Sequence, residues 1–559
     1  MAEDIRLEKN FEEYISRKLN TLQGWEYSPN DEGFDPQTAL YWPDFVSWLE
    51  AISPEKVEKA RKSYQENWEN VIRLSLVKNL EDNGTVYVLR HGFGFAGLGT
   101  IECSGAKPED GRNPRTNLLY EKNILRVMRQ VHYQTAGDKS LDLVFFINGI
   151  PVATAELKSE LTQSYKDAIE QYKNDRQPIE PGTNRKNYLL MYRRGAVVHF
   201  AMSEDEVWMC TNLCGRSSRF LPFNMGNAGH AGNPPMQPGD TDYPTGYFWN
   251  EVCRRDAWLD IFHGFIFEEK KMVEDATGRK KEVRTQIFPR YHQWDCVTKV
   301  VNDITEKKTD ARYLIEHSAG SGKTATISWL AYKLSELRTK EGERYYSSVF
   351  VITDSLVLDT NLKDALKQLS LPLGVIATIG GDGHKKEAGS KSSKLEKAIE
   401  DKRQIIIVTL QTFPYAVDVI NSSSDLKGCN FAVLIDEAHR SQTGKASGKM
   451  KSILKLAAEG RGNEEDVDDE DVINAYLREL QNSRAMPSNV SFLAFTATPK
   501  QSTFELFGTP SGRIDDKTGR QINEAFHLYP MRQAIEEGYI LDVLKGYIPY
   551  KTAYRMDET

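Results

Sequence analysis

HSAGSGKT, at residues 317–324, is the stretch that decides the expected fold of the second half of this chain. A short apolar run, Tyr313–Ile315, precedes it, and a helix-like run, Ala325–Leu337, follows it. Glycines allow the backbone to curl closely around an anion, and the amide groups of a helix N-terminus point at that anion. Lys323 would reach the β and γ phosphates of a nucleotide, and the Thr324 hydroxyl would ligate Mg²⁺. The stretch therefore predicts a phosphate-binding loop.

One end of this loop departs from the full pattern. G-x4-G-K-T would have glycine at position 317, where this chain has His317. A plain glycine turn before a helix is the alternative interpretation. The nucleotide-binding residues that the loop predicts are Ser318, Ala319, Gly320, Ser321, Gly322, Lys323 and Thr324.

A second acidic motif supports the nucleotide site. The apolar run Phe431–Ile435 ends in Asp436-Glu-Ala-His439. Carboxylates that follow a buried strand lie where α/β sheets bind their ligands. We expect Asp436 to hold Mg²⁺ and Glu437 to act as general base toward the attacking water.

Two further segments complete the set. Thr496-Ala-Thr498 follows the apolar run Ser491–Phe495, and Gln293 lies upstream of the phosphate loop. Strands alternate with amphipathic helices through this half, which predicts a parallel sheet covered on both faces. The expected strands are Tyr313–Ile315, Val349–Ile352, Ile405–Val408, Ala432–Ile435 and Ser491–Phe495.

Taken in this order, the four motifs resemble those of superfamily 2 helicases. The resemblance implies that Gln293 reads adenine and that Thr496 and Thr498 couple the state of ATP to the grip on DNA. It also implies that the strand-end segments 349–354 and 405–412, including Thr409, touch the DNA backbone, where contacts position without reading sequence. In such motors a second RecA-like lobe supplies an arginine finger. No second lobe is evident here, so we expect a fragment with weak or no DNA-stimulated ATPase activity.

The first half contains a second candidate site, in SLDLVFFINGIPVATAELK at residues 140–158. Asn148-Gly149 between two apolar runs predicts a type I′ hairpin joining strands Leu143–Ile147 and Val152–Leu157. Side chains alternate along a strand, so Glu156 and Lys158 share a face, and Asp142 can approach them from the paired strand. Two carboxylates and a lysine can bind Mg²⁺ and activate water against a phosphodiester. The alternative is an exposed, salt-bridged hairpin.

This hairpin with Asp142, Glu156 and Lys158 resembles the PD-(D/E)xK nucleases. Beside a superfamily 2 motor, it resembles the restriction (R) subunit of type I restriction-modification enzymes. The resemblance implies ATP and Mg²⁺ as cofactors, double-stranded DNA as substrate, and modification (methyltransferase) and specificity subunits as partners. It implies cleavage of unmodified foreign DNA after ATP-driven translocation, in a bacterial or archaeal cytoplasm.

The predicted fold class is α/β, in which a mixed-sheet nuclease domain precedes a RecA-like parallel-sheet domain. We expect the nuclease domain at 1–265, a charged linker at 266–285, the first ATPase lobe at 286–538 and the start of a second lobe at 539–559. A nuclease-motor of DNA repair or phage defence is an alternative function. Another is an ATP-gated DNA-binding scaffold whose nuclease domain is inactive.

Helper residues for the nuclease site are less defined. Related enzymes often have Gln-x3-Tyr in the next helix, but here Gln171 is followed directly by Tyr172, and residue 175 is Asp. Gln171 remains a weak candidate. Glu8 and Glu12 lie one turn apart and could join the metal site, although acidic residues in a first helix are usually solvated.

The composition limits the remaining possibilities. A net charge of −8 argues against a generally basic nucleic-acid binder but leaves room for a local basic groove. No apolar run is long enough for a membrane span, and six cysteines do not make a disulfide framework. The sequence GFGFAG at residues 92–97 spells a dinucleotide-binding motif after a strand-like run at 86–90, but no helix start follows it, and we expect a loop.

Overall fold

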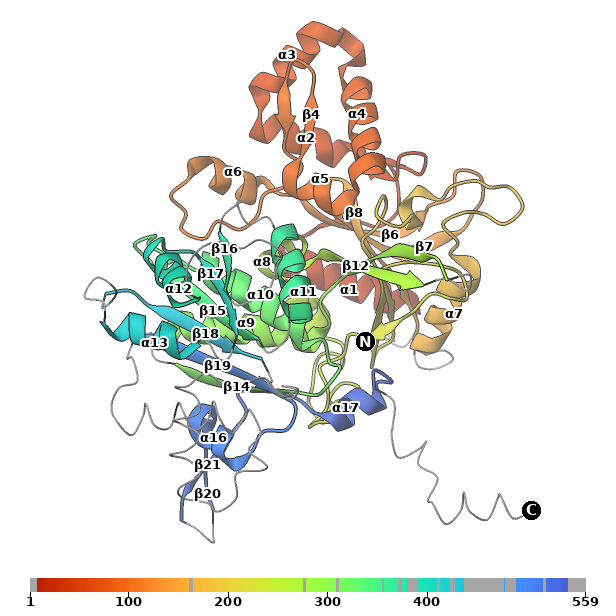
Figure 1. Cartoon of the computed structure of the whole chain (residues 1–559). Coiled ribbons are helices and arrows are strands. Elements are labelled where there is room, and N and C mark those ends of the chain that lie inside the picture. Colours follow the sequence, from red (N-terminus) through yellow and green to blue (C-terminus); the bar gives the residue numbers. More distant parts are fainter. Residues whose placement is uncertain are drawn as a thin grey trace.

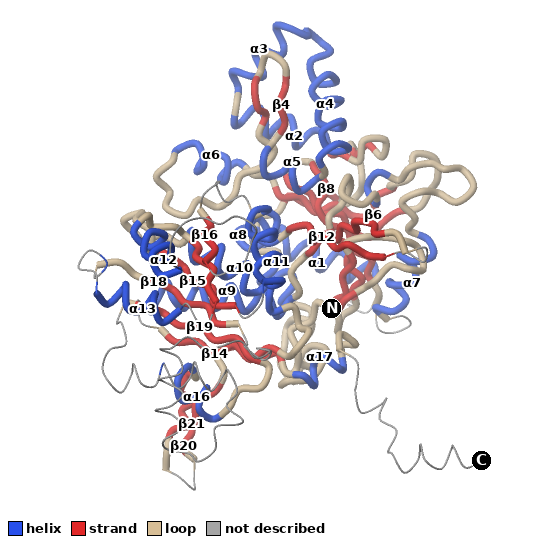
Figure 2. Tube along the Cα trace, viewed as in Figure 1, coloured by secondary structure: helices blue, strands red, loops and turns tan. Residues whose placement is uncertain are grey.

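The computed structural model describes most of the chain. The described ranges are 8–159, 164–274, 278–307, 311–353, 356–369, 375–379, 391–409, 413–422, 426, 428–436, 477, 489–515 and 519–540. Two seven-stranded sheets dominate these residues, one in each half of the chain, and Figure 2 shows them as two separate groups of strands. No helix within the described ranges is both long and apolar enough to cross a membrane.

The first sheet is mixed, as predicted. Its strand order is β1-β6-β7-β8-β9-β10-β11. The pairs β1·β6 and β8·β9 are parallel and the other four are antiparallel. The strands are β1 (Glu26–Ser28), β6 (Leu125–His132), β7 (Ser140–Ile147), β8 (Ile150–Leu157), β9 (Val198–Met202), β10 (Val207–Cys210) and β11 (Leu221–Pro222).

Helices cover both faces of this sheet. Leu143 and Phe145 of β7 pack in the same buried cluster as α1 (Glu8–Gln23). Val144 alternates with them and packs in the cluster of α7 (Tyr165–Asp175). Because both faces are buried, β7 and β8 read as continuous apolar runs and not as alternating ones.

A group of helices projects from the first half between β3 (Leu40–Tyr41) and β6, at the top of Figure 1. Its helices are α2 (Trp42–Ile52), α3 (Pro54–Tyr64), α4 (Trp68–Asn83) and α5 (Thr85–His91). The run at 86–90, interpreted as strand-like, is helical in α5. The glycine-rich segment after it forms a hairpin of β4 (Phe93–Phe95) and β5 (Gly99–Ile101), not an open loop. Gly92 ends α5 with φ of 66°, a conformation that favours glycine.

The second sheet is parallel throughout, which confirms the prediction. Its order is β16-β17-β15-β18-β19-β14-β22, and all five expected strands are present. β16 and β22 were not predicted. The strands are β14 (Arg312–His317), β15 (Ser348–Thr353), β16 (Ile376–Ile379), β17 (Ile405–Thr409), β18 (Phe431–Ile435), β19 (Val490–Thr496) and β22 (His527–Tyr529).

Each face of this sheet carries its own helices. Val349 and Val351 of β15 share a buried cluster with α9 (Tyr291–Lys307), α10 (Lys323–Glu336) and α11 (Leu356–Gln368). Phe350 and Ile352 face the opposite cluster, which contains α12 (Lys391–Glu400), α13 (Phe413–Ser422) and α16 (Gln501–Phe507). Because all strands of this sheet are parallel, their carboxyl ends lie along one edge of the sheet, between the two helix layers.

A charged linker was expected over 266–285, and the described residues of this stretch are mostly strand. It forms a hairpin of β12 (Phe267–Glu274) and β13 (Lys280–Ile287). Aromatic contacts join the two halves beside it: Phe200 of β9 lies 6.1 Å from Phe288, ring centre to ring centre, and Trp329 of α10 donates its Nε1–H to the Phe265 carbonyl at 2.6 Å. One buried apolar cluster therefore runs from the first sheet into the second.

Candidate active sites

The β7–β8 hairpin positions the first candidate site. Asn148 and Gly149 both have positive φ, 50° and 77°, as the predicted turn requires. The strands extend further than predicted, and their register pairs Leu143 with Ala155. The next position along places Asp142 opposite Glu156, where cross-strand side chains are neighbours.

All three predicted catalytic side chains are buried, which excludes the exposed salt-bridged hairpin. Asp142, Glu156 and Lys158 are 7%, 0% and 6% exposed. Asp142 Oδ2 accepts a hydrogen bond of 2.7 Å from the backbone N–H of Leu157. The Lys158 N–H donates to the Met202 carbonyl at 2.9 Å, so the pairing of β8 with β9 continues through Lys158.

Only one of the two carboxylate oxygens of Glu156 has a hydrogen-bond partner. Arg176, at the C-terminal end of α7, donates to Glu156 Oε1 at 2.5 Å, but Oε2 is buried without a hydrogen-bond partner. Burial, and then the charge of Asp142, raises the pKa of Glu156 well above its usual range, against the pull of Arg176 and Lys158. An unpartnered buried carboxylate oxygen beside a second carboxylate is a suitable place for a divalent cation.

A third carboxylate joins this site from α1. Glu12 is 3% exposed, and its Oε1 accepts from Gln130 Nε2 at 2.8 Å. The same Gln130 nitrogen lies 3.2 Å from Asp142 Oδ1, and Arg129 Nε donates to Glu12 Oε2 at 3.2 Å. Burial, followed by the charge of Asp142, raises the pKa of Glu12 to about 7.

Sequence reasoning left Glu12 outside the site because first-helix acids are usually solvated. The available signal was its place in the helix: Glu12 is next to Phe11 and one turn before Ser16, and both are buried on the face toward the sheet. The Glu8 side chain lies outside the described residues. Gln171 is only partly buried, and Arg176, which directly follows α7, donates a hydrogen bond to Glu156.

The phosphate loop begins the second candidate site. Gly320 and Gly322 have φ of 74° and 86°, and α10 starts at Lys323, two residues before the helix-like run predicted from Ala325. His317 is the last residue of β14, with an extended backbone that needs no glycine. The departure from the glycine pattern therefore leaves the curled part of the loop intact. Lys323 Nζ donates to the His317 carbonyl at 3.2 Å.

Two loop hydroxyls indicate space for a polar ligand. Ser318 Oγ and Ser321 Oγ are buried and have no hydrogen-bond partner. Ala319 and Gly320 are exposed at the open side of the loop. Buried hydroxyls are normally satisfied, so these atoms fit a loop that receives the oxygens of a phosphate group.

Gln293 lies against the loop. Its Nε2 donates to the Gly322 carbonyl at 3.1 Å, and its Oε1 accepts from the Arg290 backbone N–H at 3.0 Å. A cavity of about 620 Å³ opens beside Gln293 and Thr324. Its walls also include Arg290 and Tyr539, the β12–β13 hairpin, and residues of β10 and β11 from the first sheet.

The other motor residues lie at the ends of neighbouring parallel strands. Asp436 follows β18, is 9% exposed, and donates its backbone N–H to the Ile352 carbonyl at 3.1 Å. Thr496 ends β19, and its hydroxyl accepts from the Thr498 N–H at 3.3 Å. Thr409 ends β17. Glu437 and His439 lie outside the described residues.

Two family models match the chain. Residues 6–218 match the type I restriction enzyme R protein N terminus, and residues 292–459 match the SWI2/SNF2 ATPase. The first part of the chain is thus similar to the N terminus of type I restriction R proteins, and a later part is similar to SWI2/SNF2 ATPases. The first match contains the whole Asp142–Lys158 hairpin and Glu12, and the second contains the phosphate loop and Asp436.

Individual relatives are described as type I restriction enzyme endonuclease subunits. The type I restriction enzyme HindI endonuclease subunit of Haemophilus influenzae is 22% identical over 96% of this chain and 46% of its own length. A Methanocaldococcus jannaschii protein, assigned as the MjaVIIIP type I restriction enzyme endonuclease subunit, is 27% identical over 60% of this chain and 31% of its own. The chain thus spans 31% to 46% of the length of these relatives.

A solved structure is also similar. It is the fragment structure of a protein assigned as an HsdR subunit of a type I restriction enzyme from Vibrio vulnificus, 14% identical over 74% of this chain and 56% of its own, with a TM-score of 0.27.

Proposed function

We propose that this chain is the endonuclease and ATP-dependent DNA translocase subunit of a type I restriction enzyme. The observation that carries the proposal is the buried group of Asp142, Glu156 and Lys158, in the same chain as a phosphate loop with unpartnered hydroxyls. Its substrate would be unmodified double-stranded DNA. Its partners would be modification and specificity subunits, which would supply target recognition in the cytoplasm of a bacterium or archaeon.

In the nuclease site, Asp142, Glu156 and Glu12 would hold Mg²⁺, which supplies an activated water and neutralises charge on the phosphodiester. Arg176 keeps Glu156 Oε1 in place and leaves Oε2 available. The Leu157 N–H fixes the orientation of Asp142 in the same way. Lys158 would place its ammonium group against the negative charge that develops on the phosphate.

In the motor site, Lys323 would exchange the His317 carbonyl for the β and γ phosphates of ATP. Thr324 and Asp436 would hold the Mg²⁺ of the nucleotide, and Glu437 would take the proton of the attacking water. Gln293 is already oriented by Arg290 and would meet the adenine edge. Three threonines would couple the bound state of the nucleotide to contacts with the DNA backbone: Thr496, Thr498 and Thr409.

The test is cleavage of circular double-stranded DNA by the complex of this chain with its modification and specificity subunits. We expect cutting to require both Mg²⁺ and ATP, and to stop when a chelator or a non-hydrolysable ATP analogue is used. Cutting that needs Mg²⁺ but no ATP hydrolysis would favour a nuclease-motor of another DNA repair or defence system. Nucleotide-dependent DNA binding without any cutting would favour the scaffold with an inactive nuclease domain.

A further inference from the structure

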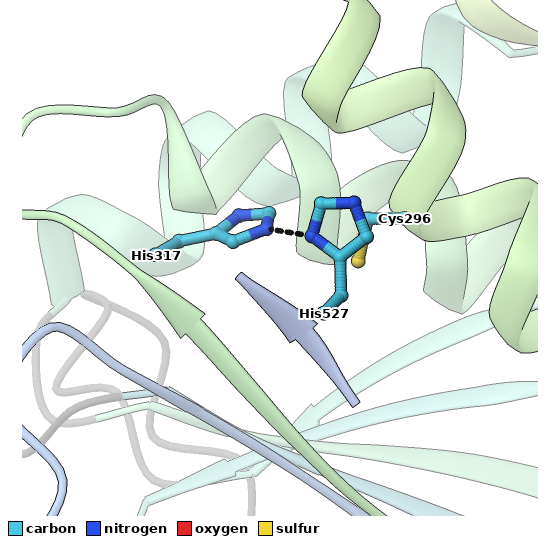
Figure 3. A group of neighbouring side chains, drawn as sticks. All are labelled: Cys296, His317 and His527. Atoms are coloured by element: carbon cyan, nitrogen blue, oxygen red, sulfur yellow. Dashed lines mark hydrogen bonds between the residues drawn. The ribbon is translucent and has the colours of Figure 1, made fainter. Parts of the chain in front are cut away.

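Three buried side chains line up directly behind the phosphate loop. His317, at the end of β14, lies with its Nε2 2.8 Å from Nδ1 of His527, the first residue of β22. His527 Nε2 lies 3.1 Å from Asp295 Oδ2 in α9. Figure 3 shows the two imidazole rings facing each other, with Cys296 beside them. None of the nucleotide-binding motifs accounts for His527 or Asp295.

We propose that Asp295, His527 and His317 form a hydrogen-bonded triad that fixes the entrance of the phosphate loop, so that His527 and Asp295 are positioning residues for nucleotide binding. The proposal rests on the proposed function in one respect, which is that the loop binds a nucleotide. The triad itself is a property of the chain without ligand.

The direction of the hydrogen bonds follows from Asp295. Burial pushes its pKa up, but the hydrogen bond from His527, together with Lys299 at 2.7 Å, outweighs burial and lowers it. An ionised Asp295 accepts from the Nε2–H of His527. In the neutral pair, His527 Nδ1 must then accept, and His317 must donate its Nε2–H.

This arrangement explains an unpartnered atom. His317 Nδ1 is buried without a hydrogen-bond partner. In the tautomer just derived, His317 Nδ1 carries no proton and is therefore an acceptor without a donor. A buried acceptor without a partner costs less free energy than a buried N–H without a partner. Burial, followed by nearby positive charges that include Lys323 and Arg290, lowers the pKa of the His317 ring well below its usual range, which keeps the ring neutral.

The triad acts on the loop through the backbone. The carbonyl of His317 accepts from Lys323 Nζ, and the next residue, Ser318, donates its N–H to the Tyr529 carbonyl of β22 at 2.9 Å. Tyr529 also stacks on His292 with ring centres 3.7 Å apart. A shift of the His317 ring would therefore move the carbonyl against which the phosphate-loop lysine rests.

The same residues suggest a metal site, but the distances favour the hydrogen bond. Cys296, His317 and His527 are buried, and their ligand atoms lie within 4.8 Å of one another, a nitrogen and sulfur set that suits zinc. Two ligands at about 2.0–2.1 Å from one tetrahedral ion lie roughly 3.3 Å apart. The two ring nitrogens are closer, at 2.8 Å. A metal-bound histidine would also normally donate its other N–H, and His317 Nδ1 has no acceptor.

The experiment compares variants of the full chain by calorimetric titration with Mg-ATP. His527→Ala removes the ring, whereas His527→Asn can still accept the His317 Nε2–H, because an asparagine amide reaches the position of Nδ1. We expect His527→Ala to weaken binding about tenfold and His527→Asn to stay within about threefold of the wild type. Asp295→Asn should fall between them. Cys296→Ala should bind as the wild type does.

A second measurement separates positioning from general loss of stability. Amide hydrogen exchange over residues 312–326 without nucleotide should accelerate in His527→Ala and return toward the wild-type rate in His527→Asn. Equal exchange and equal affinity in both variants would overturn the triad. So would one zinc ion per chain that is lost in Cys296→Ala. If the wild type binds no Mg-ATP, the proposed function fails, and the exchange rates still decide whether the triad holds the loop.

Discussion

The two candidate sites use their sheets in opposite ways. In the first sheet the reactive groups lie within buried strands: Asp142 on β7 and Glu156 on β8, among apolar neighbours. In the second sheet they follow the strands, as Lys323 and Asp436 do after β14 and β18. A carboxylate inside a strand loses water and depends on distant partners, whereas a residue at a strand end meets its ligand in an open loop.

The two candidate sites also differ in the charge of their side chains. The first site gathers three carboxylates, and burial raises the pKa of two of them, Glu12 and Glu156. The second site leaves hydroxyls and amide groups for an anion. The first site therefore leaves a buried carboxylate oxygen for a cation, and the second leaves donors for an anion, as a metal-dependent nuclease joined to a nucleotide-driven motor would need. One buried apolar cluster contains residues of both sheets.

The largest expected effect comes from Lys323→Ala. Loss of the ammonium group should weaken ATP binding by roughly 10²-fold, the scale of a lost charge-assisted contact in a phosphate site, and should abolish both ATP hydrolysis and cutting in the complex. Calorimetry and plasmid cleavage measure the two results. Lys340→Ala, at an exposed lysine of the same lobe, is the matched control. Persistent cutting would show that the two sites are not coupled.

Lys158→Ala should separate the two sites. Cleavage should fall on the order of 10³-fold, because the charge that stabilises the transition state is lost, while ATP hydrolysis continues. Parallel assays of ATPase activity and plasmid cleavage measure this. The control is Lys166→Ala, at an exposed residue of α7. Cutting that survives would remove Lys158 from the nuclease site.

The raised pKa of Glu12 predicts a pH dependence of stability that arises at the first site. Its pKa is raised from 4.5 to about 7, so the metal-free native chain keeps a proton that the unfolded chain releases. The stability contribution of Glu12 is therefore lost as pH rises from about 4.5 to 7 and stays low above that range.

Glu12→Gln should remove this loss and raise the melting temperature of the metal-free chain at pH 8 by a few degrees, with little change at pH 4.5. Mg²⁺ should stabilise the wild type more at pH 8 than at pH 6, because Glu12 must ionise to bind it. Thermal denaturation with and without Mg²⁺ measures both effects. Glu58→Gln, at an exposed acid on α3, serves as control. Identical pH profiles for Glu12→Gln and the wild type would place Glu12 outside the metal site.

The smallest expected effect distinguishes two glycines of the phosphate loop. Both have positive φ, so alanine should cost about 1 kcal/mol at either position. A Cβ at Gly322 would also lie 2.5 Å from Gln293 Nε2, whereas at Gly320 its nearest neighbour is 3.8 Å away. Gly322→Ala should therefore weaken ATP binding more than Gly320→Ala, as measured by titration. The reverse order would show that Gln293 does not rest against the loop.

The sequence alone determined five strands of the second sheet and the turn of the first hairpin. Apolar runs of three to five residues followed by HSAGSGKT, Asp436 and Thr496 identify parallel strands with candidate functional residues at their ends, because these signals are contiguous and local. Asn148-Gly149 fixed the β7–β8 turn through its need for positive φ, but the register shift between Phe145 and Phe146, which brings Asp142 opposite Glu156, is seen only in the structure. Short strands such as β16 and β22 carried too little local pattern to be predicted.

Only the tertiary structure decided which distant residues complete each site. Glu12, Arg129 and Arg176 reach the hairpin from α1, β6 and the end of α7, and their partners are known only once the sheet is assembled. His527 lies 210 residues from His317 in the chain and meets it because β22 adds to the edge of the second sheet. Local periodicity specifies strands and turns, but the burial and pairing of charges depend on long-range packing.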